Sequence, residues 1–537
     1  MNTKTQFPAL LLGVVGLSLL VNGCSSEKTP EASAKEVPSN LNLTGFPIVK
    51  EPIKLTFLAG MGSTTSTNWN ETMIWKEYAK TTNMTIDFQL TPFENLKEKQ
   101  NLLLASQDYP DAFHTARFTP TDLMKYGSQG IFLPLNDLID RYAPNFKKVM
   151  ETYPWVKQGI TMPDGNIYGF PLIYEPGFNS ILVSQKLFIK DEWLKKLNMQ
   201  PPETLDDLYN YLKAVKTTDL NGNGKQDELG LGGVKLTPLL DNLKGSFGLM
   251  NRGTANKYID LDPKSNKLRF YPTDPAYKQL LEYVNKLWKE GLIDKDILTI
   301  KDQEFFVKGK QGNYGAVVTT WTASNMQQPG YSIPKALKGP NGDQIFTATS
   351  SPLVQLGAFT ITDKNKYPEA TVRWMDHFYG DEGMKNFFLG FKDLTFVELP
   401  NGEFDYSDLI KNKPAEKTTN QVLASYVTWP GGSYPGLVTR KYFRGSNEEN
   451  NRLMSPLDPY IIKEIWPAFT FTSDETDELA ALATDLGTYV EEMTTKFISG
   501  DVPFSEWDKY VSTVNKMKLD SFMGIYEKAY NRYQNAK

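Results

Sequence analysis

Cysteine is almost absent from this chain, which has one, Cys24, in 537 residues. A single cysteine excludes an intrachain disulfide. Positive charge is not in excess either, because the formal net charge is −5, and the sequence predicts no basic surface of the kind that binds nucleic acid. We find no P-loop, no H-E-x-x-H and no nucleophile-elbow sequence. The chain therefore lacks these three enzyme signatures, and we expect no nucleic-acid partner.

Length and composition indicate a large globular protein. A chain of 537 residues is longer than one hydrophobic core supports, so we expect two lobes. Hydrophobic residues make up 40% and aromatic residues 12%, which is typical of folded rather than disordered proteins. The 10 Trp, 27 Tyr and 30 Phe are numerous enough to line a ligand site as well as to fill a core.

The first residues predict secretion and attachment to a membrane. The apolar run Leu10–Val21 is too short to span a bilayer. It ends at Val21-Asn22-Gly23-Cys24, which resembles a bacterial lipobox. We therefore expect residues 1–23 to be a lipoprotein signal peptide. Cys24 would then carry acyl chains, palmitate among them, that anchor the protein at the extracytoplasmic face of the cell membrane. An ordinary signal peptide or a buried free cysteine is the alternative.

The folded body is expected to begin after a tether. Residues 24–52 are rich in Ala, Ser, Glu and Pro without an apolar period, which predicts a disordered leash. From residue 53, expected strands at 53–58, 85–90 and 110–114 alternate with helical patterns, which favours a parallel sheet with helices on both faces. Ligands collect at the carboxyl ends of such strands, here at Gly60–Trp69 and His114–Arg117.

Later segments predict a second lobe. Tyr168–Pro176 contains two prolines and is expected to be an extended segment that crosses between the lobes. A helix is expected from Phe188 to Leu197, and amphipathic helices from Thr472 onward are expected to complete a lobe. We place residues 53–172 and about 340–400 in lobe I, and residues 173–339 and about 401–537 in lobe II.

The segment Asp219–Glu228, DLNGNGKQDE, carries the most specific pattern. Oxygen side chains recur at Asp219, Asn221 and Asn223, a glycine stands at the sixth position, and Asp227 and Glu228 return two carboxylates. Alternating oxygens on a tight loop surround a hard cation at roughly 2.3–2.6 Å. The pattern follows the EF-hand loop, except that the closing Glu stands at the tenth position instead of the twelfth. We expect a structural calcium ion; a metal-free Asn-Gly turn is the alternative.

These pieces together resemble the extracellular solute-binding proteins of ABC importers, in the family that binds sugars. The resemblance covers nearly the whole chain. It rests on the lipobox, the strand after the tether, the helix Phe188–Leu197, the strand Gly315–Trp321, and Gly357–Ile361 followed by the helix Pro368–Gly383. The loop at residues 219–228 is similar to that of a large lipoprotein branch that includes alginate-oligosaccharide binders.

The resemblance implies a periplasmic-binding-protein-like fold. In that fold two α/β lobes, each a sheet flanked by helices, are joined by a hinge and close around a ligand, and a helical C-terminal part follows. It also implies the calcium ligands, which are Asp219, Asn221, Asn223, Lys225 through its backbone carbonyl, Asp227 and Glu228.

A sugar site needs flat aromatic faces for stacking and polar groups for hydroxyls or carboxylates. The resemblance places Trp321 at a strand end that faces the cleft. The Gly/Pro-rich loop 429–436 is expected to display two aromatic rings. Core packing or a solvated surface role is the alternative at every position. The residues that we expect at the ligand site are Trp321, Trp429, Tyr434, Trp69, Arg117 and Tyr174.

Two classes of function remain open. The first is a monomeric binding lipoprotein that captures an oligosaccharide by lobe closure and delivers it to the permease subunits of an ABC transporter in the membrane. The second is a secreted, calcium-stabilised glycosidase or lyase, which would need paired carboxylates across a cleft. The order of elements and the tether favour the binding protein.

Overall fold

The computed structural model describes residues 37–62, 65–414, 416–417, 419–428, 434–442 and 447–536. Residues Asn40–Lys537 form one compact unit and Met1–Ser39 form another. The expected signal peptide and Cys24 lie outside the described residues. No helix in the described ranges combines the length and the apolar character that crossing a membrane requires.

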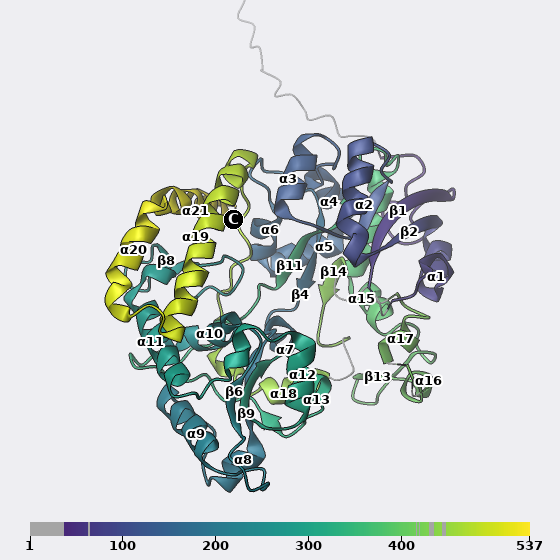
Figure 1. The fold of residues 1–537 in the computed structure, drawn as a ribbon. Coiled ribbons are helices and arrows are strands. Elements are labelled where there is room, and N and C mark those ends of the chain that lie inside the picture. Colours follow the sequence, from purple (N-terminus) through teal and green to yellow (C-terminus); the bar gives the residue numbers. More distant parts are fainter. Residues whose placement is uncertain are drawn as a thin grey trace, which may run out of the picture. The chain divides into compact units, whose positions relative to one another are not determined.

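A six-stranded sheet organises the first half of the compact unit (Figure 1). Strands β1, β2 and β3 pair in parallel, as the sequence predicts, and β11 pairs antiparallel with both β3 and β4. The order across the sheet is β14 (Gly436–Val438), β4 (Phe170–Tyr174), β11 (Leu353–Ile361), β3 (Ala112–Phe118), β1 (Ile53–Met61) and β2 (Met84–Pro92).

Helices pack with this sheet into the first core. They are α1 (Met73–Thr82), α2 (Phe93–Ser106), α3 (Pro120–Ser128), α4 (Asn136–Tyr142), α5 (Pro144–Thr152), α6 (Pro154–Ile160), α14 (Pro368–Asp376), α15 (Asp381–Phe388), α16 (Asp408–Lys411) and α17 (Thr419–Leu423), with the hairpin β12 (Phe396–Glu398) and β13 (Phe404–Tyr406).

A four-stranded sheet organises the second core. Its order is β10 (Tyr331–Ser332), β5 (Lys186–Lys190), β9 (Tyr314–Thr319) and β6 (Leu229–Gly232). Beside it lie the hairpin β7 (Ile259–Leu261) and β8 (Leu268–Phe270), and the helices α8 (Asp191–Lys196), α9 (Leu205–Thr217), α10 (Leu236–Lys244), α11 (Pro275–Lys289), α12 (Asp302–Lys310), α13 (Thr322–Met326) and α18 (Asn447–Met454).

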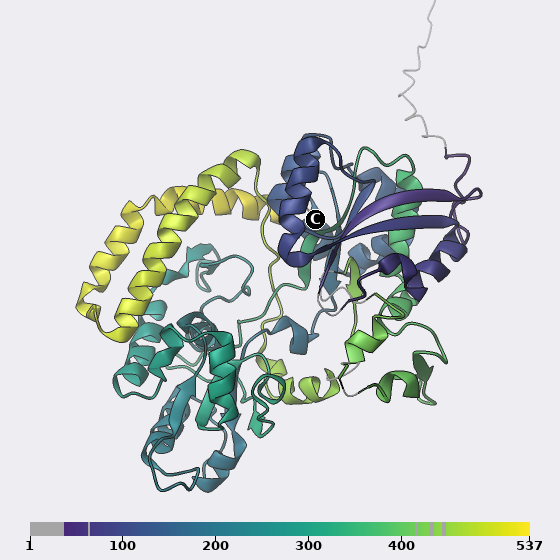
Figure 2. The same ribbon diagram turned by 45° about the vertical axis from the view of Figure 1, so that its right-hand side comes forward.

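Three long helices complete this second half, as expected for the C-terminal part. They are α19 (Ser473–Ser499), α20 (Trp507–Lys516) and α21 (Leu519–Asn535). Helix α19 begins with a capping box, in which the Thr472 hydroxyl accepts a hydrogen bond from the Glu475 amide at 3.2 Å. Figure 2 shows these helices, in yellow, apart from the first sheet. The mixed α/β fold class with two flanked sheets is therefore confirmed.

Two local predictions were wrong. Residues 186–190 form the strand β5, and only the short helix α8 follows, although the sequence predicts a helix from Phe188. Leu187, Phe188 and Ile189 are all buried, so this central strand has no polar face to reveal a two-residue period. Residues 170–174 form the inner strand β4 of the first sheet instead of crossing between lobes. Pro171 is tolerated there because it lies opposite an irregularity in the pairing with β11.

The boundaries of the lobes also differ from those expected. Leu41, Ile48 and Val49 are buried in the first core, so residues 40–52 belong to the folded body and not to the tether. Buried side chains from residues 404–442 likewise belong to the first core, although we place this stretch in lobe II from the sequence. The chain passes between the cores at residues 178–183, 346–353 and 442–454.

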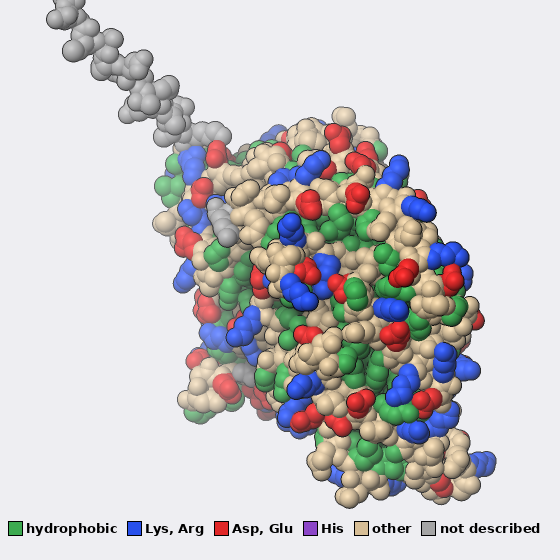
Figure 3. Space-filling view, turned by 90° about the vertical axis from the view of Figure 1, so that its left-hand side faces the viewer, with side chains coloured by type: hydrophobic (Ala, Val, Ile, Leu, Met, Phe, Trp, Pro, Cys, Tyr) green, Lys and Arg blue, Asp and Glu red, His purple; other side chains and the backbone are tan. Residues whose placement is uncertain are grey.

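Charges are interspersed on the face in Figure 3, where basic and acidic side chains alternate across the surface without a continuous basic patch. This distribution agrees with the net charge of −5. On this face, the protein offers no electrostatic footprint for nucleic acid.

His114 stands at the centre of the first core. It is 1% exposed, and the rings of Trp69, Trp75 and Trp374 lie 5.7–6.1 Å from its own. Neither ring nitrogen has a hydrogen-bond partner among the described residues. Burial lowers the pKa of His114 to about 3, so the imidazole is neutral in the folded protein.

We predict that His114→Phe stabilises the protein more at pH 5 than at pH 8. Between about pH 6.5 and pH 3 the unfolded chain binds a proton that the folded chain excludes, which lowers the unfolding free energy as the pH falls. At pH 5 this cost is about 2 kcal/mol. Thermal unfolding at both pH values measures it. Phe113→Leu, a buried non-titrating control on β3, should shift the melting temperature equally at both. An equal shift for His114→Phe would contradict the prediction.

Candidate ligand-binding cleft

Strand directions bring several polar residues to one edge of the first sheet. Strands β1, β2, β3, β4 and β14 run in the same direction, and β11 runs against them. Their carboxyl ends therefore share an edge with the start of β11. Arg117, Glu175 and Arg440 stand at or just beyond the ends of β3, β4 and β14. This is the edge at which ligands bind in open α/β sheets.

A cavity of about 390 Å³ opens at this edge and has walls from both halves of the molecule. Arg117 and Thr119 come from the end of β3, and Ser351 and Gln355 from the start of β11. Thr254 comes from the second half and donates its backbone N–H to the Thr349 carbonyl at 3.1 Å. The cavity therefore joins polar side chains of both cores.

The backbone at the end of β3 holds Arg117 in an unusual conformation. Thr115 has φ +48° and Arg117 has φ +58°, in the left-handed region that costs non-glycine residues about 1–2 kcal/mol each. The Thr115 hydroxyl donates to the Gly60 carbonyl at 2.6 Å and fixes this turn. A Cβ on Gly60 would lie 2.8 Å from the Thr115 carbonyl, so glycine is required there.

The guanidinium group of Arg117 lies over an aromatic ring. Its guanidinium carbon is 3.4 Å from the centroid of the Phe93 ring, a cation–π contact. Partial burial lowers the pKa of Arg117, which nevertheless stays charged at neutral pH. Arg117 thus brings a positive charge to the wall of the cavity.

Tyr174 and Glu175 close the adjacent strand. Tyr174 is half-buried and donates its backbone N–H to the Pro352 carbonyl at 2.8 Å. A Glu175 carboxylate oxygen accepts the Arg440 backbone N–H at 2.9 Å. Sequence reasoning missed Glu175, although it directly follows the expected residue Tyr174.

The second sheet presents Trp321 at its own strand end. Trp321 follows β9 and is half-buried. The Phe188 ring lies 6.1 Å away, edge to face, and the Lys186 ammonium lies 3.7 Å from the Trp321 ring centroid. Lys186 was missed because β5 was interpreted as a helix, which hid that its first residue stands at this edge.

Two of the expected aromatic residues lie in the core instead. Trp69 is 1% exposed and stacks near Trp75, with centroids 6.4 Å apart. Tyr434 is 2% exposed, stacks on Phe387 at 3.7 Å and donates its hydroxyl to the Phe378 carbonyl at 3.2 Å. Neither ring has a face left for a ligand in this structure. Trp429 lies outside the described residues.

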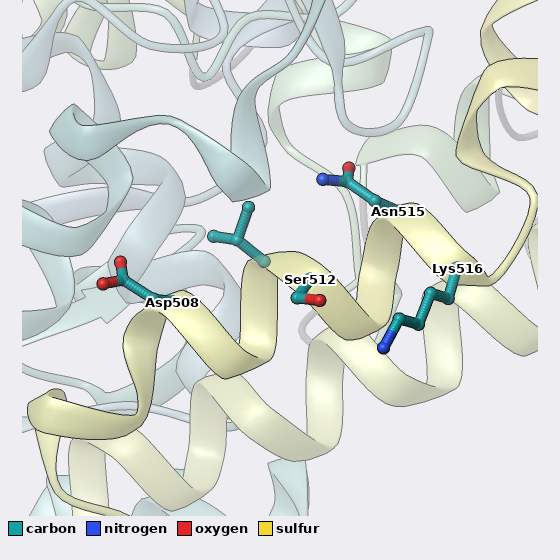
Figure 4. A pocket seen from close by; sticks show the side chains of 5 residues that line it. Asp508, Ser512, Asn515 and Lys516 are labelled. Carbon is teal, nitrogen blue, oxygen red and sulfur yellow. The ribbon is translucent and has the colours of Figure 1, made fainter.

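A larger hollow, of about 480 Å³, is not a cleft. Figure 4 shows that its labelled side chains all project from the single helix α20. Residues on one exposed helix cannot enclose a ligand, and this hollow carries no argument for binding. It is lined by Asp508, Val511, Ser512, Asn515 and Lys516.

The loop between α9 and β6 is held together by hydrogen bonds among its own residues. Asp219 accepts the backbone N–H groups of Gly222 at 2.7 Å and Gly224 at 2.8 Å, and Asn221 and Asn223 both donate side-chain amides to Asp227. These amide contacts lower the pKa of Asp227. The side-chain oxygens of Asn221 and Asn223 accept the backbone N–H groups of Asn223 and Lys225, respectively.

Glu228 provides the test of whether this loop suits a metal. One carboxylate oxygen accepts the Leu220 N–H at 2.6 Å, and the other, Oε2, is buried without a partner among the described residues. Nowhere in the described ranges do three or more His, Cys, Asp or Glu side chains form a group able to hold a metal ion. A cation here would depend on amide and carbonyl oxygens too, and this oxygen-only donor set is the kind that calcium prefers.

Comparison with known proteins decides the family. The sequence pattern of bacterial extracellular solute-binding proteins matches residues 63–385. The chain belongs to this family. This solute-binding protein is 28% identical over 563 residues to the fructooligosaccharide ABC transporter substrate-binding protein FusA of Streptococcus pneumoniae, covering 99% of each chain. It is 24% identical to the polygalacturonan/rhamnogalacturonan-binding protein YtcQ of Bacillus subtilis, covering 85% of this chain and 88% of the relative.

Solved structures agree with this membership. FusA of S. pneumoniae in complex with kestose has a TM-score of 0.70 at 25% identity and covers 90% of this solute-binding protein and 100% of its own chain. A solute-binding protein from Bifidobacterium longum infantis shares the fold, with a TM-score of 0.74 at 20% identity over 90% of this chain and 99% of its own. The predicted family is confirmed, and so is the interpretation as a binding protein instead of an enzyme.

We predict that Trp69→Ala and Trp321→Ala affect stability very differently. Removing the buried Trp69 ring should cost about 3–5 kcal/mol, because it leaves a cavity among aromatic rings. Removing the half-buried Trp321 ring should cost much less, because water already reaches part of it. Denaturant unfolding of the two variants measures the difference. Equal losses would show that Trp321 is a core residue.

Proposed function

We propose that this protein is the substrate-binding component of an ABC importer that captures an oligosaccharide between its two sheets and delivers it to a membrane permease. The observation that carries the proposal is the similarity to FusA over 99% of each chain, combined with a polar cavity whose walls come from both cores. A ligand that contacts both walls favours their closed arrangement over the open one.

The side chains at the cleft suit a sugar. Trp321 and Tyr174 provide aromatic faces for the apolar faces of pyranose or furanose rings, and both are half-buried. Arg117, Ser351 and Gln355 provide donors and acceptors for hydroxyl groups. The side-chain oxygen of Gln355, Oε1, is buried without a protein partner among the described residues, so its acceptor capacity is unused in the cavity wall.

We also propose that Cys24 is acylated and anchors the protein at the extracytoplasmic face of the membrane. The motif Val21-Asn22-Gly23-Cys24 at the end of the apolar run supports this proposal. Membership in an extracellular solute-binding family agrees with a position outside the membrane barrier. We expect the protein to act as a monomer.

The loop Asp219–Glu228 is proposed to hold a structural calcium ion. Its ligands would be Asp219, Asn221, Asn223, the Lys225 carbonyl, Asp227 and Glu228. The buried Glu228 oxygen that has no partner among the described residues supports the proposal, because burying a carboxylate oxygen without a partner is costly and a bound cation would remove that cost. One FusA structure is described as an EF-hand mutant, so a relative carries such a loop. Bound calcium would fix the end of α9 against the start of β6.

We predict that calorimetric titration with a panel of oligosaccharides will show binding without cleavage. The panel should include kestose and a galacturonate oligomer, because relatives are named for fructo-oligosaccharides and polygalacturonan. For the sugar of this panel that the wild type binds, Arg117→Ala should weaken binding by about tenfold or more, since the substitution removes a fixed charge from the cavity wall. Chromatography of the incubated sugars provides the control. Shortened products would identify an enzyme and overturn the proposal.

We predict that chelation of calcium lowers the melting temperature of the wild-type protein. A metal at 100 times its Kd stabilises the folded state by about 2.7 kcal/mol. Asp219→Ala should lower the melting temperature in calcium and remove the response to chelator. Asp262→Ala is the matched control, because Asp262 also accepts backbone N–H groups, of Lys264 and Ser265, in an exposed turn. An equal response to chelator in wild type and Asp219→Ala would exclude calcium at this loop.

A further inference from the structure

Lys186 is a buried cation at the edge of the second sheet where β9 ends. It is 1% exposed and is the first residue of β5. Its ammonium donates to the Ser184 carbonyl at 3.2 Å and to the Thr320 carbonyl at 3.4 Å, and lies 3.7 Å from the Trp321 ring centroid. Two carbonyls and a ring face occupy the three donor directions of an ammonium group. Lys186 therefore ties the start of β5 to the end of β9 and to Trp321.

Other buried cations of the second core are paired with carboxylates. Lys244 lies 2.6 Å from Asp241, and Arg269 lies 2.8 Å from Asp260. No carboxylate among the described residues forms an ion pair with Lys186. A buried charge without a counter-ion is costly, so stability alone does not explain a lysine at this position.

We infer that Lys186 is a positioning residue for ligand binding: while protonated, it covers one face of the Trp321 ring and fixes the ring so that the opposite face is presented to the sugar. The inference rests on the proposed function, because it assumes that Trp321 stacks on the ligand. Lys186 itself does not contact the ligand, since its donors are already used. Lys186 affects ligand binding only by fixing the orientation of the Trp321 ring.

The protonation state of Lys186 makes this role dependent on pH. Burial lowers the pKa of Lys186 to about 7, and no neighbouring charge contributes to the shift. Helix α13 has no ionisable residue, and on α10 Asp241 and Lys244 pair with each other. The other ionisable groups of β5, β9 and β10 are Lys190, Tyr314 and Tyr331, all at the far end of the sheet. Ligand affinity should therefore fall as the pH rises through 7, because the neutral amine no longer holds the ring.

The first test needs no ligand. Protein labelled with 15N in the tryptophan indoles gives a spectrum in which the Trp321 signal is assigned by its loss in Trp321→Phe. This signal should titrate with a midpoint near pH 7 in wild type and stay constant in Lys186→Met. Lys190→Met is the matched control. Lys190 stands at the other end of β5, where its ammonium donates to the Gly312 carbonyl and lies 4.3 Å from the Trp193 ring. In this control the Trp321 signal should titrate as in wild type.

The second test measures affinity for kestose and for a galacturonate oligomer at pH 6 and pH 8.5. For whichever of the two sugars the wild type binds, Lys186→Met should lower the affinity at pH 6 by about fivefold to tenfold. The affinity of this variant should then be the same at pH 6 and pH 8.5. Lys190→Met should match wild type. Lys186→Arg should bind equally at both pH values, because arginine keeps its charge.

The outcomes separate this inference from the proposed function. Wild-type affinity in Lys186→Met, with weakened binding in Trp321→Phe, would overturn the positioning role and leave the oligosaccharide-binding role intact. Failure of the wild type to bind any sugar would overturn the proposed function, and the indole titration would then decide the Lys186–Trp321 coupling by itself. A Trp321 signal that does not change between pH 5.5 and pH 8.5 would overturn the inference.

Discussion

The antiparallel insertion of β11 between β3 and β4 is the pairing on which the rest of the structure depends. It returns the chain to the first sheet after all four strands of the second sheet have been formed, and it places Leu353 at the same edge as the ends of β3 and β4. The irregularities in both pairings, near residues 355–359, accommodate Pro171 and a strand that carries two left-handed residues. This one strand joins β4 to β3 within the sheet, and its first residues line the cleft. A change in how β11 packs in the core would therefore also move the residues of the ligand site.

Much of this architecture could be predicted from the sequence because local patterns were unambiguous. The first strands alternate with amphipathic helices, and the loop Asp219–Glu228 contains four consecutive turn-forming residues, Asn221–Gly224, that take part in its hydrogen bonds. Predictions failed where burial on both faces removed the period, as in β5, and where a proline suggested an interruption, as in β4. Whether a short segment of that kind forms a strand or a helix depends on the elements that pack against it more than on its own residues.

The ligand site was harder to predict than the fold. Aromatic residues in Gly-rich surroundings were expected to be displayed, yet Tyr434 fills the first core and Trp69 lies beside His114. The residue type alone does not show whether an aromatic side chain points to a core or to a cleft. Arg117 was expected near the ligand because it follows a predicted strand, and Trp321 because the family resemblance places it at a strand end; both expectations come from topology. Glu175 directly follows β4, and Lys186 begins β5 beside the end of the antiparallel strand β9, so both became visible once β4 and β5 were defined.

The packing of residues 40–52 has a mechanical consequence for a protein held at Cys24. Arg373 on α14 donates to the carbonyls of Asn42 and Gly45, so a load on the N-terminal side would enter the first core directly. From Cys24 to Asn40 the chain is about 16 residues long, and it reaches at most roughly 55 Å when fully extended. The acyl anchor proposed at Cys24 would thus pull on the first core directly, and on the half that carries Trp321 and the loop Asp219–Glu228 only through the first core.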